Sequence, residues 1–199
     1  MNVKAVIWDN VGVLWHTGGN PWEEMLGVTR EELYRVMSSG PEQEMWDLDE
    51  MSMDEFYDFM IKELGLPPEK KYDMLESTRK ADNVVINMEL YSYIKKLKGR
   101  YIQAMLTNYP REWFEIGQKH YPDLMKLFDH IIASFEVKLR KPDAKIYHLA
   151  LDRIGCKANE AVFIDDTEEN VVGAQQIGIH GIHFKNNDQT IKDIEKIIN

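Results

Sequence analysis

Acidic and polar side chains follow three apolar runs of the chain, at the points where those runs end. Asp9 closes the first run, Thr107 and Asn108 follow the second, and Asp165 and Asp166 end the third. If the runs are neighbouring parallel strands, these side chains meet at the edge of the sheet where α/β proteins bind ligands. Three carboxylates in one partly buried site would take up protons unless cations balance their charge. A hard divalent ion with oxygen ligands suits that task, and magnesium is the ion expected where phosphate is also handled.

A lysine stands at a corresponding point later in the chain. Lys141 lies in Lys-Leu-Arg-Lys-Pro-Asp, just after a predicted strand and just before a predicted helix, so it could add positive charge to the same edge. Each residue taken alone has a simpler explanation, because an aspartate after an apolar run is commonly a turn former or helix cap. Their joint placement is what indicates a site.

One long stretch of the chain has only helical patterns. Nothing in residues 15–84 resembles a strand, and Thr29 with Glu32 and Ser52 with Glu55 have the spacing of helix capping boxes. We therefore predict a helical insertion, or cap, over 15–84.

Outside the insertion, strand-like and helical stretches alternate. The predicted strands lie near 3–8, 101–106, 130–135, 161–164 and 179–184, and the predicted helices near 90–97, 110–120, 143–154, 168–177 and 191–198. Such alternation requires parallel crossover connections. The predicted fold is α/β, a three-layer sandwich with a parallel Rossmann-like sheet, whose core is formed by residues 1–14 and 85–199.

The composition narrows the class of protein. The net charge of −10 argues against nucleic acid or an anionic membrane as partner, because either would attract a basic surface. No apolar run approaches the ~20 residues of a membrane span, and the first residues lack the layout of a signal peptide. The single cysteine, Cys156, excludes an internal disulfide. We expect a cytoplasmic protein that is a monomer or homodimer.

Four segments resemble the four sequence motifs of the haloacid dehalogenase-like superfamily, in the same order and over nearly the whole chain. They are Ile-Trp-Asp-Asn-Val-Gly-Val-Leu (7–14), Met-Leu-Thr-Asn (105–108), Arg-Lys-Pro-Asp-Ala-Lys-Ile-Tyr (140–147) and Val-Phe-Ile-Asp-Asp-Thr-Glu-Glu-Asn-Val (162–171). The insertion after the first motif resembles the small helical cap of the branch that includes small-metabolite phosphatases. The resemblance implies a magnesium-dependent phosphatase acting on a small phosphorylated metabolite, such as a sugar phosphate.

The resemblance also assigns catalytic roles. Asp9 would be the nucleophile that attacks phosphorus and forms an aspartyl-phosphate, which divides one difficult displacement into two easier ones. The hydroxyl of Thr107 and the backbone N–H of Asn108 would donate hydrogen bonds to the phosphoryl oxygens. Lys141 would hold the phosphate and the nucleophile together.

A magnesium site is implied by the same resemblance. The carboxylates of Asp9 and Asp166 and the backbone carbonyl oxygen of Val11 would hold the ion, and Asp165 would contribute directly or through water. The charges of a divalent ion and of Lys141 would then balance those of the three carboxylates. The negative charge of the phosphoryl group would be stabilised by hydrogen bonds.

Val11 departs from the pattern of the family. In most phosphatases of the superfamily an aspartate at this position protonates the leaving group and later activates water, a contribution of ~10²- to 10⁴-fold in rate. Four consequences are open: a preference for good leaving groups such as aryl, acyl or anomeric sugar phosphates; a substitute acid from the loop or cap, with His16 as a candidate; slow turnover; or no catalysis.

Two other functions compete with a phosphatase. The dehalogenase branch also lacks an acid at the position of Val11, but its chemistry needs no magnesium, so the pair Asp165 and Asp166 argues against it. A catalytically inactive phosphate-binding or interaction protein is favoured by Val11, whereas the presence of Asp9, Lys141 and Asp166 argues against it.

Overall fold

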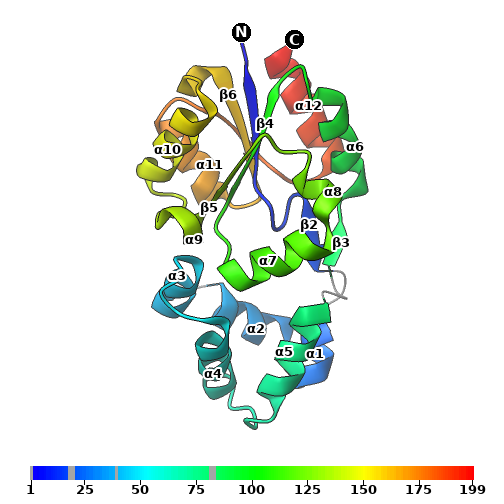
Figure 1. Cartoon of the computed structure of the whole chain (residues 1–199), viewed down its shortest axis with the longest axis vertical. Helices are drawn as coiled ribbons and strands as arrows, with labels where there is room; N and C mark the ends of the chain where they lie inside the picture. Colours follow the sequence, from blue (N-terminus) through cyan, green and yellow to red (C-terminus); the bar gives the residue numbers. More distant parts are fainter. Residues whose placement is uncertain (1, 18–20, 39, 81–83) are drawn as a thin grey trace.

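The computed structural model of the protein describes residues 2–17, 21–38, 40–80 and 84–199. At its centre lies a five-stranded parallel sheet in the order β5-β4-β1-β6-β7, with a group of helices beyond the carboxyl ends of the strands (Figure 1). The strands are β1 (Ala5–Trp8), β4 (Ile102–Thr107), β5 (His130–Ala133), β6 (Ala161–Asp165) and β7 (His180–His183). The predicted α/β fold with a parallel sheet is confirmed.

The central strand β1 shows why the strands of this sheet have apolar sequences. All four of its residues are buried, and it pairs with β4 on one side and β6 on the other. Val6 and Trp8 belong to one hydrophobic cluster, whereas Ala5 and Ile7 belong to another, because successive side chains of a strand point to opposite faces. A strand covered on both faces therefore needs an apolar residue at every position.

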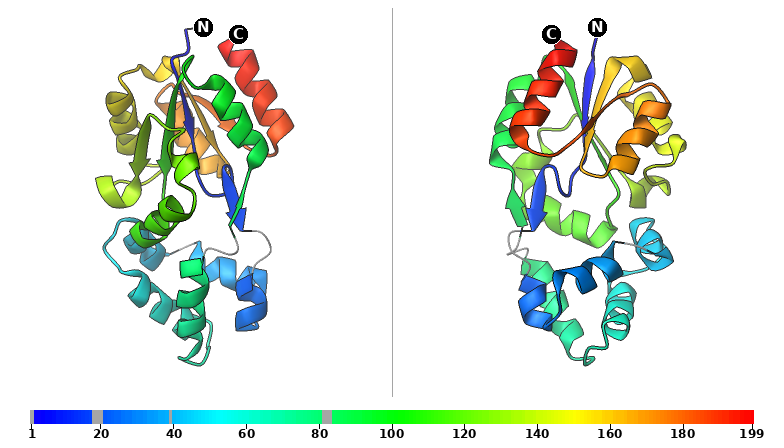
Figure 2. Two further views of the ribbon diagram at one scale, coloured as in Figure 1. Left: turned by 45° about the vertical axis from the view of Figure 1, so that its right-hand side comes forward. Right: turned by 180° about the vertical axis from the view of Figure 1, so that it is seen from behind.

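Helices cover both faces of the sheet, as Figure 2 shows. Ile94 and Ile194 pack in the cluster of Val6, and Ile146 packs in the cluster of Ile7. The face of Val6 carries α6 (Met88–Leu97), α7 (Arg111–His120), α8 (Pro122–Met125) and α12 (Asn187–Ile198), and the face of Ile7 carries α10 (Ala144–Ile154), η1 (Ala158–Glu160) and α11 (Glu168–Gln176). No helix in the described ranges is both long and apolar enough to cross a membrane.

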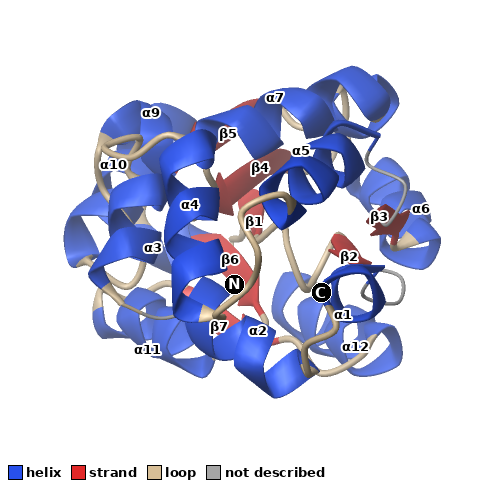
Figure 3. Cartoon of the chain, turned by 90° about the horizontal axis from the view of Figure 1, so that it is seen from below, coloured by secondary structure: helices blue, strands red, loops and turns tan. Residues whose placement is uncertain are grey.

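The helices beyond the sheet have a hydrophobic cluster of their own, which includes Trp46, Phe56 and Met60. Both predicted capping boxes form there, one at the start of α2 and one at the start of α4. Viewed from below, these helices surround the carboxyl ends of the central strands (Figure 3). They are α1 (Pro21–Leu26), α2 (Arg30–Met37), α3 (Pro41–Asp47), α4 (Met53–Glu63) and α5 (Lys70–Lys80).

The prediction that residues 15–84 contain no strand is wrong at both ends of that stretch. β2 (Trp15–Thr17) and β3 (Val84–Ile86) pair antiparallel and form a separate two-stranded sheet. Each strand has three residues, too few to show a period in the sequence, and each depends on a partner far along the chain. Both chain passages between the sheet and the helices α1 to α5 therefore run through this ribbon.

The predicted strand at 130–135 is too long. β5 ends at Ala133, and Ser134–Val137 form the short helix α9. Phe135 is apolar because its ring packs against Phe114 of α7, with the ring centroids 5.4 Å apart. The apolar run thus continues past the strand because of core packing and not because of sheet pairing.

We expect Ser52→Ala to lower the free energy of unfolding by about 1 kcal/mol, because it removes a helix N-cap. The Ser52 hydroxyl accepts from the Glu55 backbone N–H at 3.3 Å and donates to the Glu55 carboxylate at 2.7 Å. Urea denaturation of both proteins measures the difference. Ser92→Ala, an exposed serine within α6, is the control and should be neutral; equal losses in the two variants would contradict the capping role.

Candidate active site

The central strand and its two neighbours bring acidic and polar side chains to one edge of the sheet. Asp9 follows β1, Thr107 ends β4 and Asp165 ends β6. The Asp9 backbone N–H donates to the carbonyl oxygen of Ile164 at 2.8 Å, so β1 and β6 stay hydrogen-bonded as far as the site. The convergence follows from the strand order, because β1 lies between β4 and β6.

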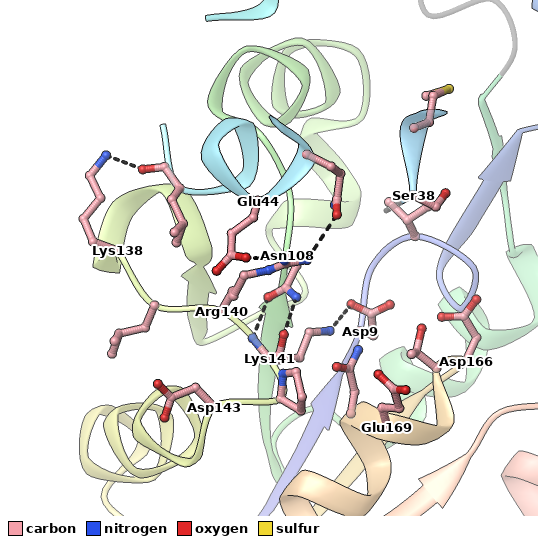
Figure 4. A pocket seen from close by; sticks show the side chains of 18 of the residues that line it. Asp9, Ser38, Glu44, Asn108, Lys138, Arg140, Lys141, Asp143, Asp166 and Glu169 are labelled. Atoms are coloured by element: carbon pink, nitrogen blue, oxygen red, sulfur yellow. Dashed lines mark hydrogen bonds and ion pairs between the residues drawn. The ribbon is translucent and has the colours of Figure 1, made fainter. Parts of the chain in front are cut away.

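Lys141 joins two of these carboxylates. Its Nζ lies 2.6 Å from Oδ1 of Asp9 and 2.6 Å from Oδ2 of Asp165, and the lysine side chain is only 2% exposed. Figure 4 shows the lysine reaching Asp9 from the loop before α10. Burial by itself lowers the pKa of Lys141, but the two carboxylates outweigh it and raise the pKa. The lysine is therefore a fixed positive charge within the site.

Asn108 holds the loop that carries this lysine. Its side-chain Nδ2 donates to the Lys141 carbonyl oxygen at 2.9 Å, and its Oδ1 accepts from the Lys141 backbone N–H at 2.8 Å. The family resemblance implied a role only for the backbone N–H of Asn108, and that role stays a prediction. The side-chain role was missed because Asn108 and Lys141 are distant in the sequence.

Three carboxylates lie close enough to share a metal ion. One oxygen from each of Asp9, Asp165 and Asp166 lies within 4.8 Å of the other two. Burial raises the pKa of Asp9 to about 7, although Lys141 lowers it, and Asp165 raises it further. Burial and then Asp165 also raise the pKa of Asp166. The one lysine that contacts them leaves negative charge uncompensated, so this set of oxygen donors fits a hard divalent cation.

Thr107 has a buried hydroxyl that lacks a partner. The residue is 1% exposed, and its Oγ1 forms no hydrogen bond within the described part of the chain. A buried hydroxyl without a partner costs about 1–3 kcal/mol. At the same sheet edge as Asp9, such a donor fits an anionic oxygen of a bound ligand.

The turn after Asp9 brings the backbone against Asp166. Gly12 has a φ of +89°, and a Cβ at this position would overlap the carboxylate of Asp166. Only glycine allows this approach. Val11, the residue before it, is 39% exposed and lines the cleft above the carboxylates.

A cleft of about 680 Å³ extends from this edge of the sheet to the helices beyond it. His16 is not among the residues that line it, since this side chain lies on β2. The structure thus does not bring the predicted substitute acid into the described cleft. Helices α2 and α3 and the residues next to them line the cleft with Tyr34, Met37, Ser38, Gln43, Glu44 and Leu48.

Ion pairs join α3 and the loop of Lys141. Nη2 of Arg140 lies 3.2 Å from Oδ2 of the buried Asp47, and Nη1 lies 3.6 Å from Glu44. Burial raises the pKa of Asp47 to about 7, although Arg140 lowers it.

A second ion pair joins the residues after α3 to the start of α7. Asp49, just beyond α3, receives two hydrogen bonds from Arg111, each of 2.9 Å. Sequence reasoning missed these pairs, since charged residues occur throughout this part of the chain.

Asn170 is a further residue that the sequence reasoning missed. It is 9% exposed, and its Nδ2 lies 3.1 Å from each carboxylate oxygen of Asp165. The available signal was its place five residues after Asp165, in the first turn of a predicted helix, where an amide can point back toward the end of the strand.

Comparisons with known proteins agree with this arrangement. Residues 3–178 match the family of haloacid dehalogenase-like hydrolases. The sesquiterpene phosphatase astK of Aspergillus oryzae is 28% identical over 202 residues, covering 98% of this chain and 96% of that protein.

Two solved structures show the same fold. A HAD-like family hydrolase from Porphyromonas gingivalis has a TM-score of 0.77 at 23% identity and covers 100% of this chain and 98% of its own. A HAD family enzyme from Bacteroides thetaiotaomicron, solved in complex with magnesium and inorganic phosphate, has a TM-score of 0.75 at 21% identity, covering 95% of this chain and 98% of its own. Because the family match covers most of the sequence, the protein belongs to the haloacid dehalogenase-like hydrolase family.

Proposed function

We propose that this hydrolase is a magnesium-dependent phosphatase that acts on a small phosphorylated metabolite through an aspartyl-phosphate on Asp9. The observation that carries the proposal is the contact of Lys141 with Asp9, beside three clustered carboxylates and the unpartnered hydroxyl of Thr107. The phosphatase from Aspergillus oryzae and the phosphate-bound enzyme from Bacteroides thetaiotaomicron support it.

The residues of the site would divide the reaction into two displacements. A carboxylate oxygen of Asp9 attacks phosphorus, a new O–P bond forms, and the bond from phosphorus to the leaving oxygen breaks. Water then attacks the phosphorus, the bond from phosphorus to the Asp9 oxygen breaks, and the proton of the water passes to the phosphate or to solvent as Asp9 is restored and inorganic phosphate leaves. Lys141 favours the ionised form of Asp9 and attracts the phosphoryl oxygens, while Thr107 donates a hydrogen bond to one of them.

The metal would be held by Asp9, Asp166 and the Val11 carbonyl oxygen, with Asp165 nearby. When bound, magnesium supplies positive charge that offsets the carboxylates and the phosphoryl group. Without a cation, burial and the repulsion from Asp165 and Asp166 raise the pKa of Asp9 to about 7 despite Lys141, so a substantial share of Asp9 is protonated near neutral pH. A protonated carboxyl is a poor nucleophile, so the cation and the lysine both serve the first displacement.

Val11 determines which leaving groups the enzyme would accept. Its side chain carries no proton, so the leaving oxygen departs unassisted by this position. We infer a preference for phosphate esters whose leaving groups are stable as anions, such as aryl, acyl or anomeric sugar phosphates. A dehalogenase also fits Val11, but the close carboxylates favour a reaction that uses a divalent ion.

Asp9→Asn should abolish magnesium-dependent hydrolysis of p-nitrophenyl phosphate, lowering kcat by roughly 10³-fold or more, because an amide is not a nucleophile here. Absorbance of released nitrophenolate gives the rate. Asp188→Asn, an exposed residue on α12, is the matched control and should keep full activity. Unchanged rates in Asp9→Asn, or full wild-type activity in a metal chelator, would refute the mechanism.

Val11→Asp should speed hydrolysis of alkyl phosphates more than that of aryl phosphates, because a positioned acid contributes ~10²- to 10⁴-fold only where the leaving group needs a proton. The ratio of kcat/KM for glycerol phosphate and p-nitrophenyl phosphate measures the effect. Val11→Asn controls for size and polarity. If Val11→Asp changes both substrates alike, the missing proton donor is not what limits the wild-type protein.

Gly12→Ala should displace Asp166 and weaken magnesium binding by roughly 10-fold or more. Gly155→Ala is the matched control, since Gly155 also has a left-handed φ, of +77°, but a Cβ there would point into open space. Both variants should lose about 1–2 kcal/mol of stability from backbone strain. Isothermal titration calorimetry with Mg²⁺ compares them, and equal affinities would exclude the proposed role of Gly12.

A further inference from the structure

We propose that Asn170 and Asp165 form a positioning pair that holds Lys141 against the nucleophile. In this arrangement Asp165 acts through hydrogen bonds and is not a direct ligand of the metal. The inference rests on the proposed phosphatase function, and it assigns Asn170 a part in that reaction.

The first observation is that Asp165 already uses its acceptor sites. Oδ2 accepts from Lys141 at 2.6 Å, Oδ1 accepts from the backbone N–H of Thr167 at 2.8 Å, and each oxygen lies 3.1 Å from Asn170 Nδ2. A carboxylate offers about four lone-pair sites. Asp165 is also fully buried. Little acceptor capacity is left for a metal ion.

The other two carboxylates differ in this respect. Within the described residues, Asp9 accepts a side-chain hydrogen bond at Oδ1, from Lys141, and none at Oδ2. Asp166 is exposed at the cleft. Asp9 and Asp166 therefore have oxygens available for a cation. The three carboxylates thus divide into two that can hold a metal and one that holds the lysine.

Asn170 is itself fixed in place from the opposite side. The hydroxyl of Tyr147, on α10, donates to the Asn170 carbonyl oxygen at 2.7 Å. The ring of Tyr147 packs edge-on against Phe163 of β6, with the centroids 5.6 Å apart. The amide therefore approaches Asp165 from a rigid helix start that is tied both to the sheet and to α10.

An amide is chemically suited to this position. It donates hydrogen bonds to the carboxylate oxygens of Asp165 without adding a charge that would compete with Lys141 for them. A lysine side chain has four flexible carbon atoms and would otherwise lose more entropy when it meets the phosphate. With two of its three donors on Asp9 and Asp165, the ammonium has one left for a phosphoryl oxygen.

The test is a series of variants at Asn170, assayed with p-nitrophenyl phosphate. Ser keeps one donor, Ala keeps none, and Asp adds a charge that repels Asp165. We expect kcat to fall in the order Asn, Ser, Ala, Asp, with a loss of roughly 10–100-fold for Asn170→Ala and KM within about 3-fold. A purely structural role would make kcat follow the melting temperature of the metal-free variants, and not this order.

Magnesium binding separates positioning from metal ligation. By calorimetry, Asn170→Ala should keep the wild-type Mg²⁺ affinity within about 3-fold, whereas Asp166→Asn should lose roughly 10-fold or more. Gln176→Ala, which removes an exposed amide at the end of the same helix, is the matched control and should bind Mg²⁺ like the wild type. A loss of Mg²⁺ affinity in Asn170→Ala equal to that of Asp166→Asn would overturn the assignment.

A crystal structure of Asn170→Ala tests the pair without any turnover. We expect the Asp165 carboxylate to rotate and Lys141 Nζ to leave hydrogen-bond distance of Asp9. If the wild type hydrolyses phosphate esters and Asn170→Ala does so equally well, the positioning pair is wrong and the phosphatase function stands. If the wild type hydrolyses none, the phosphatase function fails, and an unmoved Lys141 in the variant would reject the pair as well.

Discussion

The ion pairs of Lys141 with Asp9 and Asp165 are the interaction on which the rest of the site depends. Removing such charges from water is costly, and their mutual attraction offsets the cost only when the geometry is good and the remaining donors and acceptors are satisfied. Asn108 fixes the backbone of Lys141, and Asn170 and the Thr167 backbone satisfy Asp165. The arrangement of these polar groups is therefore explained largely by the need to stabilise the buried charges of Lys141, Asp9 and Asp165.

The order of the strands makes that cluster possible. β1 lies between β4 and β6, so the residues that follow the three strands start close together, and the loop before α10 reaches the same edge with its lysine. The neighbour of the lysine, Arg140, contacts Asp47 and Glu44 of α3. One short segment of chain thus contacts both Asp9 and helix α3 across the cleft, so a displacement of α3 would affect the surroundings of Asp9.

The charge balance also links Val11 to the proposed chemistry. An aspartate at that position would add a fourth carboxylate to a site where burial and repulsion already raise the pKa of Asp9 and Asp166. Valine avoids that repulsion but gives up a proton donor. The protein therefore combines a cluster of three carboxylates with an apolar residue, Val11, in the lining of the same cleft.

The sequence by itself determined the parallel α/β fold and the residues that gather at the sheet edge, because buried strands are continuous apolar runs and their ends carry the polar residues. It also determined both capping boxes, which depend on residues three positions apart. Tertiary structure alone decided the ribbon of β2 and β3, the end of β5 at Ala133 and the position of His16 away from the described cleft. It also decided the side-chain contacts of Asn108 with Lys141 and of Asn170 with Asp165. The contact of Asn170 with Asp165 spans only five residues and depends on how the helix start packs, whereas the others depend on contacts between segments distant in sequence. The strength of all of them comes from geometry and burial that no local pattern of residues encodes.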